Sequence, residues 1–336
     1  MRPGAPTMIL VAAAVIAVVC GCSERAVGGA AVGSAGPAAG SAGAAGHGDR
    51  RAAIDDAQLT KLLREADAHG AVLVTEVATG AVVASAGVGR DVAAPVLPLS
   101  VIKLCLAALW WEHDRGDGDF AYRGRRVTVH DVLVDGWDHP GEEMAIELRR
   151  TLGAQAMLAE LRGYGLGAGL TLPGDADDAR WGSALSIGEH DAVVTLPIVA
   201  GFLRAIGGGT SLLRPETRQR LQSAMRGAVE QGTAKSAGAR LGAMSSIDER
   251  SESGRGPAGS AGGEGARPLS IAWRLGGKTG TGPFGAEPHD GWFAGLIFDR
   301  GAPRYTVAVY VERHGPGGGV AAGIAAEIVR LLAARP

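Results

Sequence analysis

The sequence predicts an α/β fold of the α+β type: an antiparallel sheet with flanking N- and C-terminal helices and an inserted helical region. Two β-rich parts, residues 71–87 and 270–313, enclose a long stretch that is mostly helical in pattern. Strands at both ends of a helical middle are typical of such a sheet. The 336 residues, 46% of them hydrophobic, are sufficient for one large core.

The first predicted elements are a helix and a hairpin. Residues 55–70 (DDAQLTKLLREADAHG) carry apolar residues at helical spacing and end in glycine, which favours a helix. Two β-rich runs follow over residues 71–87 and meet at Thr79-Gly80, which indicates a hairpin. The next helix is expected near Ser100.

The remaining elements complete the sheet and its cover. Residues 141–165 have a helical pattern, and a helix is expected to begin at Glu142-Glu143 because acidic residues favour the positive end of the helix dipole. Three β-rich runs then return, and an apolar helical segment ends the chain. These segments are residues 270–282, 290–299, 304–313 and 320–335.

The N-terminus has the pattern of a targeting segment over residues 1–22. Residues 8–19 form an apolar run of 12 residues, the length of a signal-peptide core and too short to span a bilayer comfortably. The following Val-Cys-Gly-Cys resembles a bacterial lipobox, with Cys22 as the lipidated cysteine. An ordinary signal peptide is the alternative. Either way we expect an exported chain, and with the lipobox a cell-membrane lipoprotein that faces the periplasm or another extracytoplasmic space.

Two low-complexity segments divide the rest of the chain. Residues 23–50 are rich in Gly, Ala and Ser and are expected to form a flexible tether. Residues 51–336 are expected to form the folded domain, with a surface loop at residues 251–268. Cys105 is then the sole thiol of the domain, so no internal disulfide is available.

Charge and residue usage exclude several function classes. A formal net charge of −2 gives no electrostatic case for nucleic-acid binding. Neither paired CxxC motifs nor HExxH occurs, so we expect no metal and no other cofactor. The basic residues comprise 29 arginines and only four lysines, and a retained lysine indicates a site where an always-charged guanidinium would not serve.

One of these lysines, Lys103, is the only charged residue in the apolar segment 101–111 and follows Ser100 by three residues. At the first turn of a helix this spacing places both side chains on one face. A desolvated lysine can be a neutral base at pH 7, so the pair has the chemistry of a nucleophile and its base. In the structural alternative Ser100 caps the helix and Lys103 extends to the surface.

A second motif, Lys278-Thr279-Gly280-Thr281, lies at the end of a β-rich run. Its glycines permit close backbone approach, and its ammonium and hydroxyl groups suit a substrate carboxylate along a strand edge. The alternative is a glycine-rich turn with exposed polar residues. A P-loop is excluded because the upstream glycine spacing and the following helix are missing.

S-x-x-K and K-T-G in this order resemble the penicillin-recognising serine enzymes, namely the penicillin-binding protein transpeptidases and the serine β-lactamases. Residues 185–210 (LSIGEHDAVVTLPIVAGFLRAIGGGT), 229–235 (VEQGTAK) and 290–299 (DGWFAGLIFD) are similar to further segments of that family. The resemblance covers about residues 71–335. It implies the β-lactamase/transpeptidase-like form of the predicted fold.

The resemblance also implies roles for single residues. Ser100 would be the acyl-accepting nucleophile and Lys103 the base that takes its proton. The backbone N–H groups of Ser100 and Thr281 would form the oxyanion hole. The acyl donor's carboxylate would be bound by the K-T-G-T segment, comprising Lys278, Thr279, Gly280 and Thr281.

The chain departs from the family at the middle motif, normally Ser-x-Asn or Tyr-x-Asn, because it contains no asparagine. Gly136-Trp137-Asp138 is the preferred counterpart, since family insertions often follow this loop, and Pro140-Gly141-Glu142 is the alternative. Gly136 and Asp138 are therefore provisional site residues. The Asp138 carboxylate is expected to pair with Lys103 or Lys278 but lacks the amide donor. Turnover is thus slow, altered in specificity, or absent.

The family implies three functions for such a chain. The leading one is a serine D,D-transpeptidase or carboxypeptidase acting on the D-Ala-D-Ala ends of peptidoglycan stem peptides through a Ser100 ester. The alternatives are a class D-like β-lactamase, which would use a carboxylated Lys103, and a β-lactam-binding sensor without turnover. The expected partners are stem peptides, β-lactams and, through a lipid anchor, the membrane.

Overall fold

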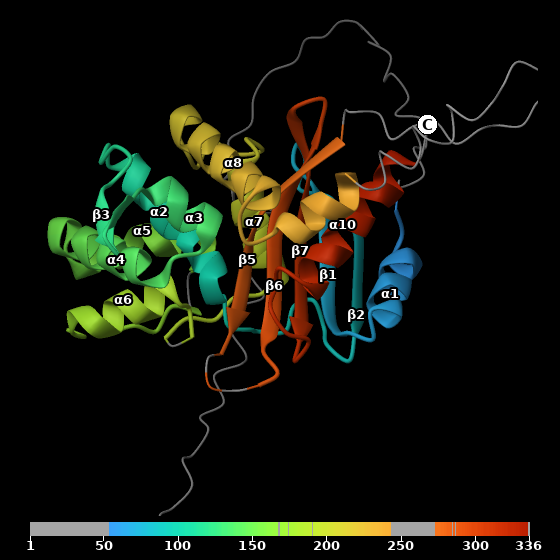
Figure 1. Ribbon diagram of the computed structural model, residues 1–336, viewed down its shortest axis with the longest axis horizontal. Coiled ribbons are helices and arrows are strands. Elements are labelled where there is room, and N and C mark those ends of the chain that lie inside the picture. The colour runs from blue at the N-terminus through green and yellow to red at the C-terminus, as the bar shows by residue number, and fades with distance from the viewer. Residues whose placement is uncertain are drawn as a thin grey trace, which may run out of the picture. The chain divides into compact units, whose positions relative to one another are not determined.

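The computed structural model describes residues 54–166, 169–173, 175–189, 191–242, 273–283, 285 and 287–334. The predicted segments 1–22, 23–50 and 251–268 lie outside these residues. The described part contains a five-stranded antiparallel sheet with the order β2-β1-β7-β6-β5, and a separate two-stranded sheet, β3-β4 (Figure 1). The predicted antiparallel sheet with flanking helices and an inserted helical region is confirmed.

The strands of the large sheet come from both ends of the chain, as the sequence predicts. They are β1 (His69–Glu76), β2 (Val82–Val88), β5 (Trp273–Gly282), β6 (Asp290–Asp299) and β7 (Ala302–Glu312), and the small sheet consists of β3 (Phe120–Tyr122) and β4 (Arg125–Val127). Pairing of β1 with β7 joins the N-terminal hairpin to the C-terminal strands. β5 is therefore an edge strand of the large sheet.

The helices lie between and beside these strands. They are α1 (Asp56–Glu65), α2 (Lys103–Glu112), α3 (Val129–Asp135), α4 (Asp138–Leu152), α5 (Ala154–Leu161), α6 (Asp178–Ser186), α7 (Leu196–Ile206), α8 (Pro215–Glu230) and α10 (Val320–Ala333). A 3-10 turn, η1 (Leu99–Ile102), precedes α2, a π turn, η2 (Arg162–Leu166), follows α5, and residues 235–242 are also helical. No helix in these ranges is long and apolar enough to cross a membrane.

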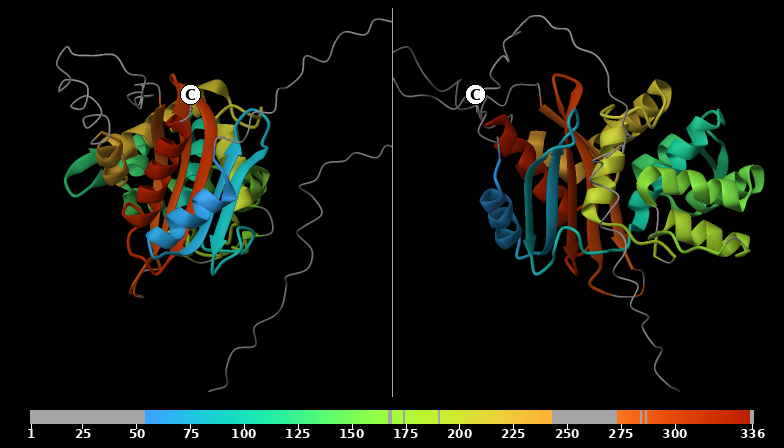
Figure 2. Two further views of the ribbon diagram at one scale, coloured as in Figure 1. Left: turned by 90° about the vertical axis from the view of Figure 1, so that its right-hand side faces the viewer. Right: turned by 180° about the vertical axis from the view of Figure 1, so that it is seen from behind.

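Both faces of the sheet are buried, because alternate side chains of each strand enter different cores. Val72 and Val74 of β1 pack with α1 and α10, whereas Leu73 packs on the side of α7 and the helical region. Figure 2 shows α1 and α10 together on one face of the sheet. Helices α2 to α6 gather beyond the β5 edge, so the residues on η1, α3 and α4 lie on the side of β5 (Figure 1).

Two predicted boundaries are wrong. The first helix ends at Glu65 and not at Gly70, which lies in β1. Helix α4 begins at Asp138 and not at Glu142-Glu143. The preceding α3 is capped by Gly136, which has φ +75°, a conformation that glycine adopts without steric cost. Gly136 and Trp137 are the two residues between the helices, so Asp138 takes the first-turn position where a carboxylate favours the helix dipole.

Candidate active site

The turn that carries Ser100 is held by backbone contacts from two sides. Leu99, the residue before it, has φ +50°, which is uncommon for a side chain of this kind. Its N–H donates to the carbonyl of Gly188 at 3.3 Å, and Trp292 Nε1 donates to the carbonyl of Leu97 at 2.8 Å. These contacts fix the backbone on which Ser100, itself partly exposed, stands.

Lys103 is completely buried at the start of α2. Its Nζ donates to Ser100 Oγ at 3.1 Å, to Asp138 Oδ1 at 2.5 Å and to the carbonyl of Gly136 at 3.4 Å. The three donors of an ammonium are thus satisfied by three acceptors from η1 and the α3–α4 junction. Lys103 does not extend to the surface, which excludes the structural alternative for this side chain.

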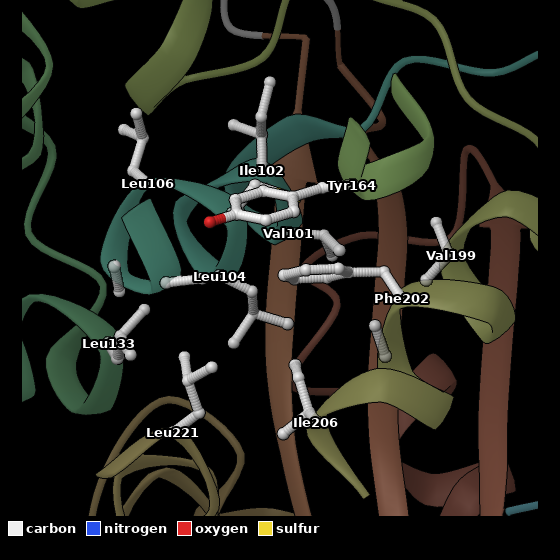
Figure 3. Packing of buried hydrophobic residues seen from close by; sticks show 14 of the residues in the cluster. Val101, Ile102, Leu104, Leu106, Leu133, Tyr164, Val199, Phe202, Ile206 and Leu221 are labelled. Carbon is white, nitrogen blue, oxygen red and sulfur yellow. The ribbon is translucent and has the colours of Figure 1, made fainter. Parts of the chain in front are cut away.

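The surroundings of η1 and α2 are apolar. Figure 3 shows Val101, Ile102 and Leu104 among buried side chains that include Tyr164 and Phe202. Burial is the main effect on the lysine and lowers the pKa of Lys103 from its usual range. The charge and hydrogen bond of Asp138 oppose this shift without reversing it.

A second buried lysine faces the same place from β5. Lys278 is 1% exposed, and its Nζ donates to the carbonyl of Thr279 at 3.0 Å. A methyl group built on Gly136 would lie 3.5 Å from this Nζ, so Lys278 reaches the α3–α4 junction. Burial and the nearby charge of Lys103 lower the pKa of Lys278 to about 7, with Asp138 acting in the opposite direction.

The two threonines of the motif face away from Lys278, as the alternation of a strand requires. Thr279 Oγ1 donates to Thr233 Oγ1 at 2.7 Å. Thr281 Oγ1 accepts from the N–H of Gly317 at 3.1 Å. The K-T-G-T segment therefore presents its ammonium to Lys103 and Asp138, and its hydroxyls to Thr233 and the loop after β7.

Gly280 permits a close approach between the sheet and the nucleophile turn. A Cβ at this position would lie 3.0 Å from Leu99 Cβ and 3.4 Å from the backbone nitrogen of Ser100. The backbones of β5 and η1 therefore run beside each other at Ser100. This contact unites the two sequence motifs, which are 175 residues apart between Lys103 and Lys278.

The two candidates for the middle motif occupy different places. Gly136 and Asp138 both hydrogen-bond Lys103 Nζ. Gly141 of the alternative lies one turn further along α4, where a Cβ would come within 3.0 Å of Lys103 Cε. Gly141 therefore contacts the aliphatic part of Lys103, whereas the Nζ of the lysine is hydrogen-bonded by Gly136 and Asp138.

Sequence reasoning missed two hydroxyl residues of this region. Ser186 is fully buried at the end of α6, and its Oγ donates to the carbonyl of Asp138 at 2.9 Å. Thr233, the partner of Thr279, lies in the 229–235 stretch that resembles the family, and this was its only signal. Ser186 likewise lies in the 185–210 stretch that resembles the family, but its contact with the site depends on tertiary packing of α6 on α4.

The described residues contain no group of three or more His, Cys, Asp or Glu side chains that could hold a metal ion.

Comparisons with known proteins identify the family of this chain. Residues 70–330 match the family described as the penicillin-binding protein transpeptidase domain, whereas no curated protein matches the chain at a significant level. The TP domain of penicillin-binding protein 3 from Burkholderia pseudomallei is 19% identical with a TM-score of 0.57, over 85% of this chain and 97% of that one.

Two further solved structures share the fold. Penicillin-binding protein A from M. tuberculosis, as an imipenem acyl-enzyme complex, is 16% identical with a TM-score of 0.57, over 81% of this chain and 76% of that one. The class D β-lactamase YbXI from Nostoc is 13% identical with a TM-score of 0.52, over 80% and 95% of the two chains. The resemblance drawn from the motifs is confirmed: this chain belongs to the penicillin-binding protein transpeptidase family.

Proposed function

We propose that this protein is an exported, lipid-anchored D,D-transpeptidase or carboxypeptidase that acylates Ser100 with the D-Ala-D-Ala ends of peptidoglycan stem peptides. One observation carries the proposal: Ser100 Oγ lies 3.1 Å from the Nζ of a fully buried Lys103. The pattern of residues 1–22, with Cys22 as the anchor, supports the location.

The reaction begins with a proton transfer. Neutral Lys103 takes the proton of Ser100 Oγ, and the oxygen attacks the carbonyl carbon between the two D-alanines. The C–N bond breaks as the proton passes to the leaving nitrogen of the terminal D-alanine, which leaves an ester on Ser100. An amine resolves the ester in transpeptidation, and water does so in carboxypeptidation. The N–H groups of Ser100 and Thr281 stabilise the oxyanion.

Charged Lys278 binds the terminal carboxylate of the donor, whereas the hydroxyls of Thr279 and Thr281 face away from it, toward Thr233 and Gly317. Its 1% exposure supports this role, because an ammonium taken out of water gains most from an incoming anion. The same two groups of the acyl donor, carbonyl and carboxylate, are present in β-lactams.

The pH dependence of acylation follows from the state of Lys278. Its pKa is lowered to about 7, so the ammonium is present below that pH and is lost as the pH rises through it. We expect the second-order rate of acylation by a labelled penicillin, measured from about pH 5.5 to about pH 9, to decline above about 7. Lys278→Met should be slow throughout and lack this decline. If the wild-type rate stays level across neutral pH, Lys278 does not bind the carboxylate as an ammonium.

The class D-like alternative rests on the apolar burial of Lys103, which suits a carboxylated lysine. Asp138 argues against it, because a carbamate on Lys103 Nζ would place two negative groups together where a 2.5 Å ion pair now stands. We therefore favour the uncarboxylated base.

Labelling of the full-length protein tests the proposal. It is incubated with a fluorescent penicillin, a chromogenic cephalosporin and a D-Ala-D-Ala stem peptide, and the adduct is located by tryptic peptide mapping. Peptide 91–103 contains Ser100 as its only hydroxyl residue, so a label there is unambiguous.

Each outcome of this experiment has one meaning. A long-lived adduct on peptide 91–103 together with D-Ala release supports the proposal. Fast, repeated hydrolysis of the cephalosporin would identify a β-lactamase instead. An adduct without D-Ala release would identify a β-lactam-binding sensor, and no adduct on peptide 91–103 would refute Ser100 as the nucleophile.

A further inference from the structure

The carboxylate of Asp138 is fixed beside the reacting groups. It stands on the first turn of α4, after the left-handed Gly136, and its own carbonyl accepts the hydrogen bond from buried Ser186. Its side chain remains 40% exposed, in contrast to the fully buried Lys103 that it pairs with. Asp138 is thus a rigidly placed group that solvent, and a bound molecule, can reach.

Only one oxygen of this carboxylate is used. Lys103 Nζ bonds Oδ1, and within the part of the chain that the structure describes no hydrogen bond joins Oδ2 to another residue. An ionised carboxylate accepts hydrogen bonds and donates none. The open oxygen therefore suits a donor group of the substrate, and a cationic donor most of all.

The position of Asp138 selects which part of a substrate it meets. Lys103 Nζ is hydrogen-bonded to both Ser100 Oγ and Asp138 Oδ1, so the carboxylate lies two hydrogen-bond lengths from the nucleophile. When Ser100 attacks a carbonyl carbon, the substituent next to that carbonyl comes within the same range. The carboxylate of the substrate is held by Lys278, whose Nζ faces the same α3–α4 junction, so Asp138 is left to meet the substituent on the acyl side.

The proton transfer from Ser100 to Lys103 depends on the charges around Asp138. Before acylation Lys103 must be neutral, and Lys278, whose pKa is lowered to about 7, is then the remaining lysine whose charge acts with that of Asp138. Glu142, which also acts on Lys103, adds a further negative charge. A substrate cation at Asp138 would restore the balance, and by repulsion it would also favour the neutral form of Lys103.

We propose that Asp138 makes this site selective for acyl donors, and for β-lactams, that carry an ammonium group on the substituent next to the scissile carbonyl. The proposal deepens the proposed acyl transfer at Ser100 and rests on it. Asp138 acts here as a specificity-determining residue, because its open oxygen receives the ammonium.

Two penicillins that differ by one amino group provide the test. Ampicillin carries an amino group on the side chain where benzylpenicillin carries hydrogen. We expect the full-length protein to be acylated about fivefold faster by ampicillin, the upper end of the range for a partly exposed ion pair. The preference should shrink with added salt, which screens an exposed charge pair. Intact-mass time courses at several concentrations give both second-order rates.

For each variant the acylation rate with ampicillin is divided by the rate with benzylpenicillin, so that a loss of activity common to both penicillins cancels. Asp138→Asn should bring the ratio of the two rates close to one, and Glu142→Gln should lower it partly. Glu147→Gln is the matched control, because it removes a carboxylate of the same helix that pairs with Arg115 away from the site. It should keep the wild-type ratio.

The outcomes separate this inference from the proposed function. If neither penicillin labels peptide 91–103, the acyl transfer itself fails. If both label it at equal rates in the wild-type protein, acyl transfer stands and the selectivity of Asp138 is refuted. A preference that persists unchanged in Asp138→Asn would also overturn it. If that variant is too slow to measure, the ratio in Glu142→Gln and its salt dependence decide.

Discussion

Lys103→Met is expected to slow acylation of Ser100 by about 10²- to 10⁴-fold, the range that a positioned general base contributes. Methionine has a similar length and fits the apolar surroundings, so the change removes the amine and leaves the packing largely intact. The free energy of unfolding should not fall, because burial lowers the pKa of Lys103 and the charged form is therefore costly in the folded protein. Asp138 is 40% exposed and can be solvated by water.

The measurement is a time course of labelled-penicillin incorporation, with unfolding in denaturant as the check on stability. Lys61→Met is the matched control, since the Lys61 side chain is 73% exposed on α1 and far from the site in sequence. It should leave both quantities unchanged. Incorporation at the wild-type rate in Lys103→Met would show that another group takes the proton of Ser100.

Gly188→Ala is expected to lower the free energy of unfolding by about 3 kcal/mol and to slow acylation as well. Gly188 has φ +71°, and a Cβ there would lie 2.4 Å from the carbonyl oxygen of Leu99 and 2.7 Å from its nitrogen. Both atoms are backbone, so no side chain can move aside. Relief requires a shift of Leu99, and Ser100 is the next residue.

Gly124→Ala separates the two contributions to this effect. Gly124 has a similar φ of +75° but no heavy atom within 4 Å of the added Cβ. The substitution should lower the free energy of unfolding by about 1–2 kcal/mol, the cost of the left-handed conformation alone, and should leave acylation unchanged. Denaturant unfolding and labelling of both variants give the comparison. Equal effects of the two substitutions would mean that the contact with Leu99 does not position the nucleophile.

Much of the fold could be predicted from local patterns. In β1 the apolar residues on both faces, such as Leu73 and Val74, already indicate a strand buried between two layers. Apolar residues at helical spacing within residues 55–70 indicated the first helix, although it ends at Glu65 and Gly70 lies in β1, and the β-rich runs near the C-terminus indicated the strands. These features depend on neighbours in the sequence, and sequence patterns report such neighbours well.

The parts that depend on distant contacts could not be predicted. The sequence left open whether Asp138 would pair with Lys103 or Lys278, because the choice depends on how α4 packs against η1 and β5. The left-handed conformation of Leu99 carries no local signal, and the family-like stretch 185–210 does not reveal which contact its Ser186 makes. Ser186 acts through the contact of α6 with α4, and Leu99 is held by Gly188, a residue 89 positions later.

The close contacts of the nucleophile turn have a consequence for how this protein can change over generations. A side chain at Gly188 would have to displace the backbone of Leu99, the residue before the nucleophile, and one at Gly280 would press on Leu99 Cβ at 3.0 Å. The Asp138 side chain, in contrast, is 40% exposed, so it can be substituted without such a displacement. We therefore expect the substitutions that arise in this site over generations to occur around Asp138, while Gly188 and Gly280 remain glycine.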